Sequence, residues 1–169
     1  NAPILQADGI PHNTIEAVAN AATVILMMLP DEVMPQVYLE SVAPYLKKGD
    51  TLIFASGYNV AFGYIEPPPF VDVGMIAPRT IGAAVRDKYI TGEGFYSFVA
   101  AAQDATGNIW QTILALAAGI GSLWAGALEI TIEQEAELDL FIQQAVLPSF
   151  HNMMVTAANV LLSNGYPPE

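Results

Sequence analysis

The sequence has no cysteine and few positive charges, and each absence excludes a class of protein. Without cysteine there is no disulfide framework and no cysteine-ligated zinc. Five Lys and Arg residues stand against 17 Asp and Glu residues, which gives a formal net charge of −12. So acidic a chain repels the phosphates of nucleic acids and anionic lipids, and we therefore exclude a nucleic-acid partner.

A complete dinucleotide-binding fingerprint is also missing. No Gly-x-Gly-x-x-Gly follows a strand-like run and opens a helix-like segment. His12 and His151 stand alone, with no Cys or Ser partner that would indicate a catalytic pair. Charged residues make up only 13% of the chain and apolar residues 53%, so we expect part of the surface to face something other than water.

Two long tracts carry almost no charge, one over residues 105–128 and one from residue 143 to the end of the chain. Both reach the length of a membrane span. Gly119, Gly121 and Gly126 interrupt the first tract, and Pro148, His151 and Asn152 interrupt the second. These interruptions favour buried helices of a soluble assembly over membrane-spanning segments.

The feature that organises the chain is the apolar run over residues 22–32, which ends abruptly in Leu-Pro-Asp-Glu. Such a run is typical of a strand buried on both faces of a parallel sheet. Similar runs follow over residues 51–55, 71–77 and 95–101. The pattern predicts an α/β fold in which residues 22–104 form a parallel sheet, with the strand over residues 23–29 near a sheet edge.

Ligands of open α/β sheets bind beyond the carboxyl ends of the strands. The predicted ends lie at residues 29–31, 56–57, 78–79 and 103–104. Asn13 or Thr14 can cap a helix that runs through Ala21, and Asp31 and Glu32 suit the start of the helix after the first strand.

From residue 106 onward the pattern predicts only helices, over residues 108–118, 129–147 and 149–163, with Ser149 as the cap of the last. Within them Glu135, Asp139 and Gln143 are spaced four residues apart and share one helix face. Two carboxylates at that spacing can share a magnesium ion. A solvated acidic face is the alternative, and the spacing alone favours it.

Several short motifs together resemble the ketol-acid reductoisomerase family, and the match spans essentially the whole chain. These motifs occupy residues 29–32, 57–59, 77–78, 103–107, 119–121, 133–141, 144–147 and 165–169. Members of the family use NADPH and two magnesium ions to rearrange and reduce acetohydroxy acids in branched-chain amino-acid synthesis. The resemblance implies an incomplete Rossmann-type α/β domain over residues 1–130 and part of an all-helical domain over residues 131–169.

The resemblance also implies which parts of the family's site lie inside the chain. The family's first strand and glycine-rich phosphate loop would precede Asn1, and its second pair of glutamate ligands would follow Glu169. Six positions match the family's cofactor-binding residues and would be vestiges of that site, namely Leu29, Pro30, Asp31, Glu32, Gly57 and Gly82.

Departures from the family's pattern fall at its functional positions. The strand-end histidine is Ser56, and the lysine of the next strand end is Arg79, which stays charged and cannot act as an acid or base. Asp139 is kept as a vestigial metal ligand, but Gln143 replaces the second carboxylate. Ser56 and Arg79 are therefore degenerate catalytic positions, and Trp124 replaces a further arginine.

Two hypotheses follow. In the first, which these departures favour, the protein has lost catalysis, binds no cofactor and is a structural or linker subunit. It would then bind other subunits, with a membrane complex as a possible neighbour, through apolar faces near Trp110, Trp124 and residues 142–161. In the alternative it is a working NADPH- and magnesium-dependent reductoisomerase whose remaining parts lie elsewhere. By family resemblance, its compartment would be a plastid, a mitochondrion or the bacterial cytoplasm.

Overall fold

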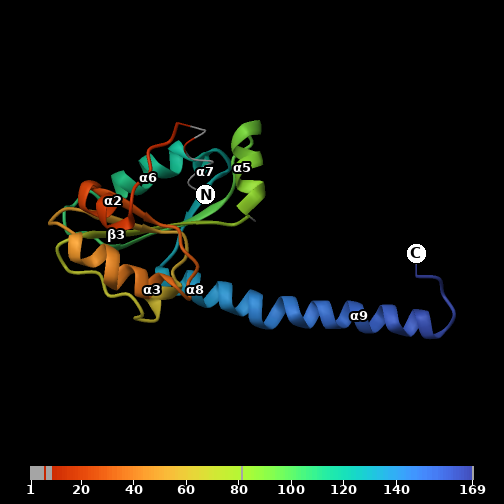
Figure 1. Ribbon diagram of the computed structural model, residues 1–169. Coiled ribbons are helices and arrows are strands. Elements are labelled where there is room, and N and C mark those ends of the chain that lie inside the picture. The colour runs from red at the N-terminus through yellow and green to blue at the C-terminus, as the bar shows by residue number, and fades with distance from the viewer. Residues whose placement is uncertain (1–5, 7–8, 81, 169) are drawn as a thin grey trace.

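The computed structural model describes residue 6 and residues 9–80 and 82–168 (Figure 1). In this part of the chain a 5-stranded sheet has the strand order β1-β2-β3-β4-β5. The strands are β1 (Val24–Met27), β2 (Thr51–Phe54), β3 (Asp72–Pro78), β4 (Ser97–Gln103) and β5 (Ala127–Glu129). The sequence predicted the first four of these strands, and β1 lies at an edge of the sheet as expected.

The prediction of an all-parallel sheet is wrong for one strand. β1, β2 and β3 pair in parallel, but β4 runs antiparallel to β3. Two consecutive strands can pair in parallel only if the connection between them crosses over the sheet, usually as a helix packed on one face. The helix between these strands, α5 (Gly82–Thr91), buries none of its residues and makes no such crossover. β4 therefore starts beside the end of β3, where Ser97 pairs with Pro78. The carboxyl end of β4 at Gln103 therefore lies beside the start of β3, away from the other predicted strand ends.

The prediction of helices alone after residue 106 is also wrong. α6 (Ile109–Gly119) confirms the first predicted helix, but β5 then pairs in parallel with β4. The short helix α7 (Ser122–Ala125) ends at Gly126, whose φ of 121° is open mainly to glycine. That backbone angle turns the chain from α7 into the sheet.

The core lies on both faces of the sheet because neighbouring strand residues point in opposite directions. Leu52 and Phe54 pack into a cluster with residues from the helices that precede and follow β1. Ile53 points the other way and packs with Ile113 of α6. Gly74 allows this close approach, because a Cβ there would lie 2.8 Å from the Ile113 Cδ1 atom.

The helices next to β1 begin largely where the sequence indicates. Thr14 caps α2 (Ile15–Ala21) by accepting a hydrogen bond from the Ala17 N–H, as predicted. After β1 the chain forms α3 (Met34–Val37), a π-helical turn (Tyr38–Val42) and a 3₁₀ turn (Ala43–Tyr45). Asp31 and Glu32 lie in the turn just before the α3 cap, Val33, so the helix begins slightly later than predicted.

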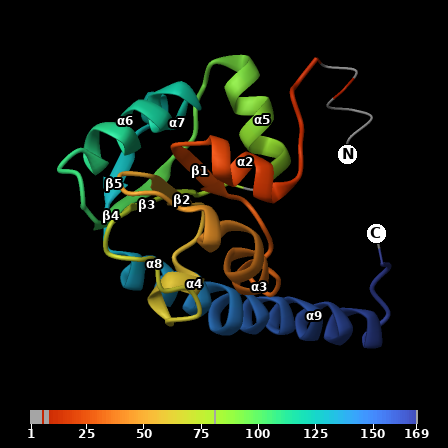
Figure 2. The ribbon, with the colours of Figure 1, turned by 60° about the vertical axis from the view of Figure 1, so that its left-hand side comes forward.

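One long helical rod ends the chain and extends well beyond the α/β body (Figures 1 and 2). It consists of α8 (Ile132–Phe141), a π-helical turn (Ile142–Val146) and α9 (Leu147–Ser163). Ser149 therefore lies inside a helix and is no cap, and residue 129 belongs to β5, which corrects both predicted boundaries. The π turn comes just before Pro148. Proline has no N–H to donate to the carbonyl four residues earlier, so the regular α-helical bonding is interrupted there.

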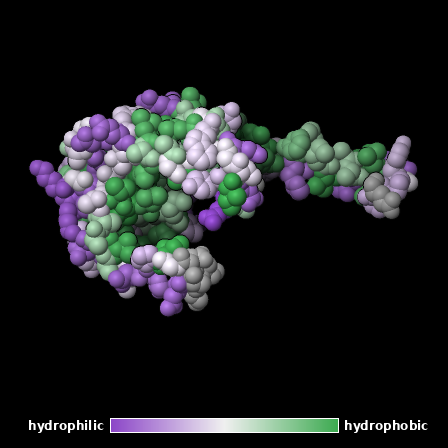
Figure 3. Space-filling model, turned by 90° about the horizontal axis from the view of Figure 1, so that it is seen from above, coloured by the Kyte–Doolittle hydropathy of each residue, from purple (hydrophilic) through white to green (hydrophobic). Residues whose placement is uncertain are grey.

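The part of the rod beyond α8 is apolar and exposed. By length and composition alone, the 32 residues Ile132–Ser163 could cross a membrane, with a mean hydropathy of 1.3 in their most apolar window. That window is 0% buried, and α9 has no buried residue. Apolar residues recur along the protruding helix and over part of the body (Figure 3). A single helix of this kind also occurs in soluble proteins, so its length and composition do not identify it as a membrane span.

Candidate functional site

The carboxyl ends of β1, β2 and β3 meet at one edge of the sheet because these strands are parallel. Residues 29–31 follow β1, residues 56 and 57 follow β2, and Arg79 follows β3. Ligands of open α/β sheets bind at such an edge. Three of the four predicted strand ends therefore lie together at this edge.

α8 lies across this edge, and Gly57 allows it to do so. A Cβ at Gly57 would lie 2.4 Å from the Ile132 carbonyl oxygen and 3.1 Å from the Glu135 Oε2 atom. Thr131 and Gln134 form a capping box that sets where the helix begins. As a result, the polar face of α8 is held directly over the strand ends.

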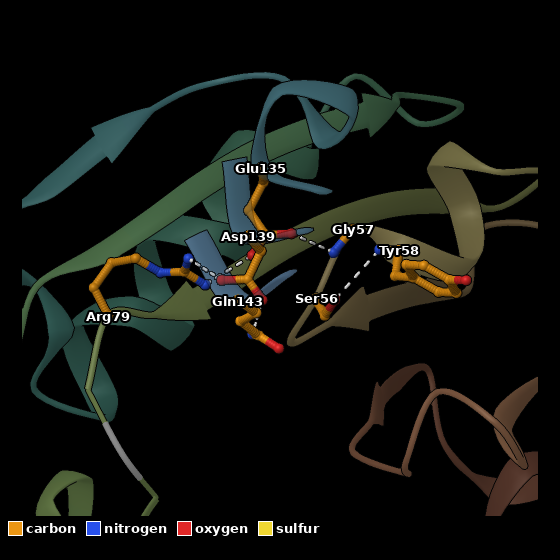
Figure 4. Close-up of polar contacts among 7 residues, drawn as sticks. All are labelled: Ser56, Gly57, Tyr58, Arg79, Glu135, Asp139 and Gln143. Atoms are coloured by element: carbon orange, nitrogen blue, oxygen red, sulfur yellow. Dashed lines mark hydrogen bonds and ion pairs between the residues drawn. The ribbon is translucent and has the colours of Figure 1, made fainter. Parts of the chain in front are cut away.

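Four side chains form a continuous polar ladder between the sheet and α8 (Figure 4). Arg79 donates from Nη2 to Glu135 Oε1 at 2.7 Å and from Nη1 to Asp139 Oδ1 at 3.0 Å. The Gly57 N–H donates to Glu135 Oε2 at 2.7 Å, and Gln143 Nε2 donates to Asp139 Oδ2 at 2.6 Å. Glu135, Asp139 and Gln143 therefore share one helix face, as their spacing predicts.

The ladder is buried at one end and exposed at the other. The Glu135 side chain is 0% exposed, whereas that of Asp139 is 34% exposed. Burial raises the pKa of Glu135, while the Gly57 N–H and the Arg79 guanidinium act in the opposite direction. The Phe98 ring lies 4.8 Å from the Arg79 Cζ atom and adds a cation–π contact.

A cleft of about 440 Å³ opens beside the ladder, between the strand ends and α8. Asp31, Ser56, Asn59, Asp139 and Gln143 contribute to its lining, together with the stacked rings of Tyr58 and Tyr64. Burial is the main cause that raises the pKa of Asp31, and the nearby charges of Glu32 and Asp139 add to it. The lining contains no Lys or Arg.

Asn59 is the buried polar group of this cleft. It is 1% exposed, and its Nδ2 donates to the Asp31 carbonyl oxygen at 3.2 Å and to Asp31 Oδ1 at 3.1 Å. Its Oδ1 has no hydrogen-bond partner among the residues that the structure describes. A buried acceptor without a partner is costly, so the cleft is suited to a ligand that donates a hydrogen bond.

The predicted site residues fall in different places. Ser56 lines the cleft, and its Oγ accepts a hydrogen bond from the Tyr58 N–H at 3.3 Å. Of the cofactor-binding positions that the resemblance implies, Asp31 and Glu32 line the cleft, whereas Leu29 and Pro30 precede it on the chain. Gly57 is buried under α8, and Gly82 opens α5 with open space around it.

The residues fit part of a nicotinamide cofactor. The partnerless Asn59 Oδ1 and the Ser56 hydroxyl suit the neutral, hydrogen-bonding end of such a molecule. The anionic phosphates find no cation in the cleft lining, and the guanidinium of Arg79 is already paired with two carboxylates.

The residues do not fit a magnesium ion at Asp139. Each oxygen of this carboxylate already accepts a hydrogen bond, one of them from a cationic guanidinium. Gln143 offers an amide where a second carboxylate would be needed to balance a dication. Among the described residues, no group of three or more His, Cys, Asp or Glu side chains could hold a metal.

Sequence reasoning missed two features of this site. It placed Glu135 on the correct helix face but did not predict its pairing with Arg79, which is 56 residues away in sequence. It also named Asn59 only as part of the motif over residues 57–59 and did not predict its buried place in the cleft, because a single asparagine in a short helix, α4 (Tyr58–Ala61), carries no local signal for burial. The separation of Arg79 from α8 allowed no local signal for the pairing.

The sheet, its flanking helices and the cleft at its strand ends define a Rossmann-type α/β protein. Residues 4–126 match the family described as acetohydroxy acid isomeroreductase, NADPH-binding domain. A ketol-acid reductoisomerase (NADP(+)) of Methanothermobacter thermautotrophicus is 42% identical over 163 residues, which cover 96% of this chain and 50% of that protein. The corresponding protein of Kocuria rhizophila is 42% identical over 165 residues, covering 97% and 48%.

A solved structure agrees with the sequence matches. The NADH-preferring ketol-acid reductoisomerase from an uncultured archaeon has a TM-score of 0.92 and 37% identity, covering 98% of this chain and 50% of that one. The chain therefore belongs to the ketol-acid reductoisomerase family. It spans about half the length of the relatives it matches.

Proposed function

We propose that this chain serves the NADP-dependent reduction step of a ketol-acid reductoisomerase, acting on the 2-keto acid formed by rearrangement of an acetohydroxy acid. The observation that carries this proposal is the close structural likeness to a solved reductoisomerase, with a cleft at the shared strand ends. NADPH, when bound, would supply the hydride for the keto carbon.

The cleft residues have separate roles in this proposal. Asn59 would accept a hydrogen bond through its partnerless Oδ1 and orient what binds there. Reduction of a carbonyl also needs a proton, and Asp31 lines the cleft with a raised pKa, so it holds a proton more readily than an ordinary aspartate. Tyr58 and Tyr64 would cover one wall and exclude water.

The test is a fluorescence titration of the purified protein with NADPH, followed by NADPH oxidation assays with acetolactate and with its rearranged 2-keto acid. We expect saturable cofactor binding and oxidation that depends on the keto acid. Asn59→Ala should weaken the binding, and Asn108→Ala, which lies outside the cleft, is the matched control. Absence of saturable binding, or oxidation independent of the keto acid, would overturn the proposal.

A second candidate function is that of a non-catalytic subunit held by protein partners. Ser56, Arg79 and Gln143 depart from the family's site, and α9 exposes Phe150, Met154 and Leu161. Trp124 stacks on Tyr89 and is still 55% exposed. These observations favour partner contacts near Trp110, Trp124 and residues 142–161. A monodisperse monomer that binds no hydrophobic dye would contradict this candidate.

A further inference from the structure

The positive charge of Arg79 lies where two of the carboxylates of α8 come together. Its two terminal nitrogens reach Glu135 and Asp139, which are one helical turn apart, at 2.7 and 3.0 Å. A guanidinium can bridge both carboxylates because it is planar and carries several fixed donors, whereas a lysine ammonium is a point charge. The Phe98 ring supports the guanidinium through its cation–π contact.

The four carboxylate oxygens of this pair are all in use. Glu135 accepts from Arg79 and from the Gly57 N–H, and Asp139 accepts from Arg79 and from Gln143. A magnesium ion needs several unblocked oxygens in near-octahedral positions. It would also lie close to a permanent positive charge, which disfavours a second cation.

Gln143 is consistent with the same arrangement. Its amide donates to Asp139 Oδ2 at 2.6 Å, and a glutamate at this position could not donate. The two carboxylates and one guanidinium leave a single net negative charge, whereas an additional carboxylate would restore the demand for a cation. Arg79 and Gln143 therefore suit one another and a site without metal.

We propose that the guanidinium of Arg79 takes the place of a divalent cation at Asp139, so that the protein binds no magnesium there and α8 is fixed to the sheet by an internal ion cluster. The inference goes beyond the reduction proposed above and does not depend on it, because it concerns metal binding and not turnover.

The test uses Mn²⁺ as a magnesium surrogate, with electron paramagnetic resonance as the readout of bound metal. We expect the wild-type protein and Asp139→Asn to bind Mn²⁺ equally, because Asp139 does not coordinate it. The Arg79→Lys/Gln143→Glu double variant should bind Mn²⁺ at least about tenfold more tightly than wild type. Its melting temperature should rise on addition of Mg²⁺, whereas that of the wild type should not.

The Arg86→Lys variant is the matched control, because Arg86 is an exposed arginine of α5 outside the cluster. It should bind Mn²⁺ as wild type does. An Mn²⁺ site in the wild type that Asp139→Asn removes would overturn the proposal, as would a folded double variant without a gain in affinity. If circular dichroism shows that the double variant is unfolded, Arg79→Met, which removes the charge and the two donors, replaces it, and an affinity equal to wild type then overturns the proposal.

Discussion

The two halves of the terminal helical rod differ in what covers them. α8 buries Ile132, Glu135 and Ala136 against the α/β body, while α9 has no buried residue although it is the more apolar half. A charged glutamate is thus fully buried while Phe150 is 56% exposed. A residue of the rod is therefore buried where a partner surface exists. Gly57 and Arg79 provide such a surface for α8, and nothing in the described chain provides one for α9.

Truncating one apolar residue in each half tests this comparison most directly. Ile132→Ala should lower the free energy of unfolding by about 2–4 kcal/mol, because it leaves a cavity between α8 and the sheet. Leu161→Ala, at a residue that is 52% exposed, should change it by less than about 0.5 kcal/mol. Urea denaturation of both variants measures the difference, and equal losses would show that α8 and α9 do not differ in how they are packed.

A second test adds a methyl group where α8 meets β2. Gly57→Ala should lower the free energy of unfolding by about 1–3 kcal/mol, because the new Cβ collides with the Ile132 carbonyl oxygen and displaces the helix. Gly82→Ala is the matched control, since a Cβ there has no neighbour within 4 Å. If both glycine variants had wild-type urea midpoints, α8 would not be packed closely against Gly57.

A smaller loss of stability is expected from a change at the start of α8. Thr131→Ala removes the hydroxyl that accepts the Gln134 N–H at 3.1 Å, and it should cost about 1 kcal/mol of stability. Thr156→Ala removes the same group from the exposed α9 and should cost almost nothing. Thermal unfolding of the two variants compares them, and a larger loss for Thr156→Ala would contradict the contrast between the two helices.

The sequence predicted the elements that depend on local patterns. Apolar runs identified four strands, and the shared face of Glu135, Asp139 and Gln143 followed from helical spacing alone. The direction of β4 was not predictable in this way, because it depends on whether the connecting helix packs on the sheet. The three exposed residues of β5 carry too little pattern to indicate a strand, since their pairing with β4 alone defines them.

The site was predictable to a similar degree. Strand ends and the family resemblance located Ser56, Arg79 and Asp139, but not the contacts among them. The pairing of Arg79 with Glu135 and the approach of α8 to Gly57 join segments that are distant in sequence. Such contacts result from the packing of the whole domain, so no local window of the sequence contains them.

The smallest expected effect concerns Asp31, which lies in the cleft between α8 and the sheet. Its pKa is raised above the ordinary value of 3.8, so its contribution to stability is fully present below that value and is lost as pH rises through the folded-state pKa. Asp31→Asn does not titrate and keeps an acceptor for the Asn59 Nδ2 atom, which donates to Asp31 Oδ1 in the wild type. The variant should therefore gain stability relative to wild type as pH rises from 3.8 toward neutrality, by less than about 1 kcal/mol.

Urea midpoints at several pH values measure this gain. Glu137→Gln, which removes an exposed carboxylate of α8, is the control for the loss of a negative charge. The gain for Asp31→Asn must exceed that of the control, because only Asp31 is partly desolvated between α8 and the strand ends. A stability difference that shrinks as pH rises would mean that the carboxylate of Asp31 is stabilised in the folded protein, and that α8 does not desolvate the charges of the cleft.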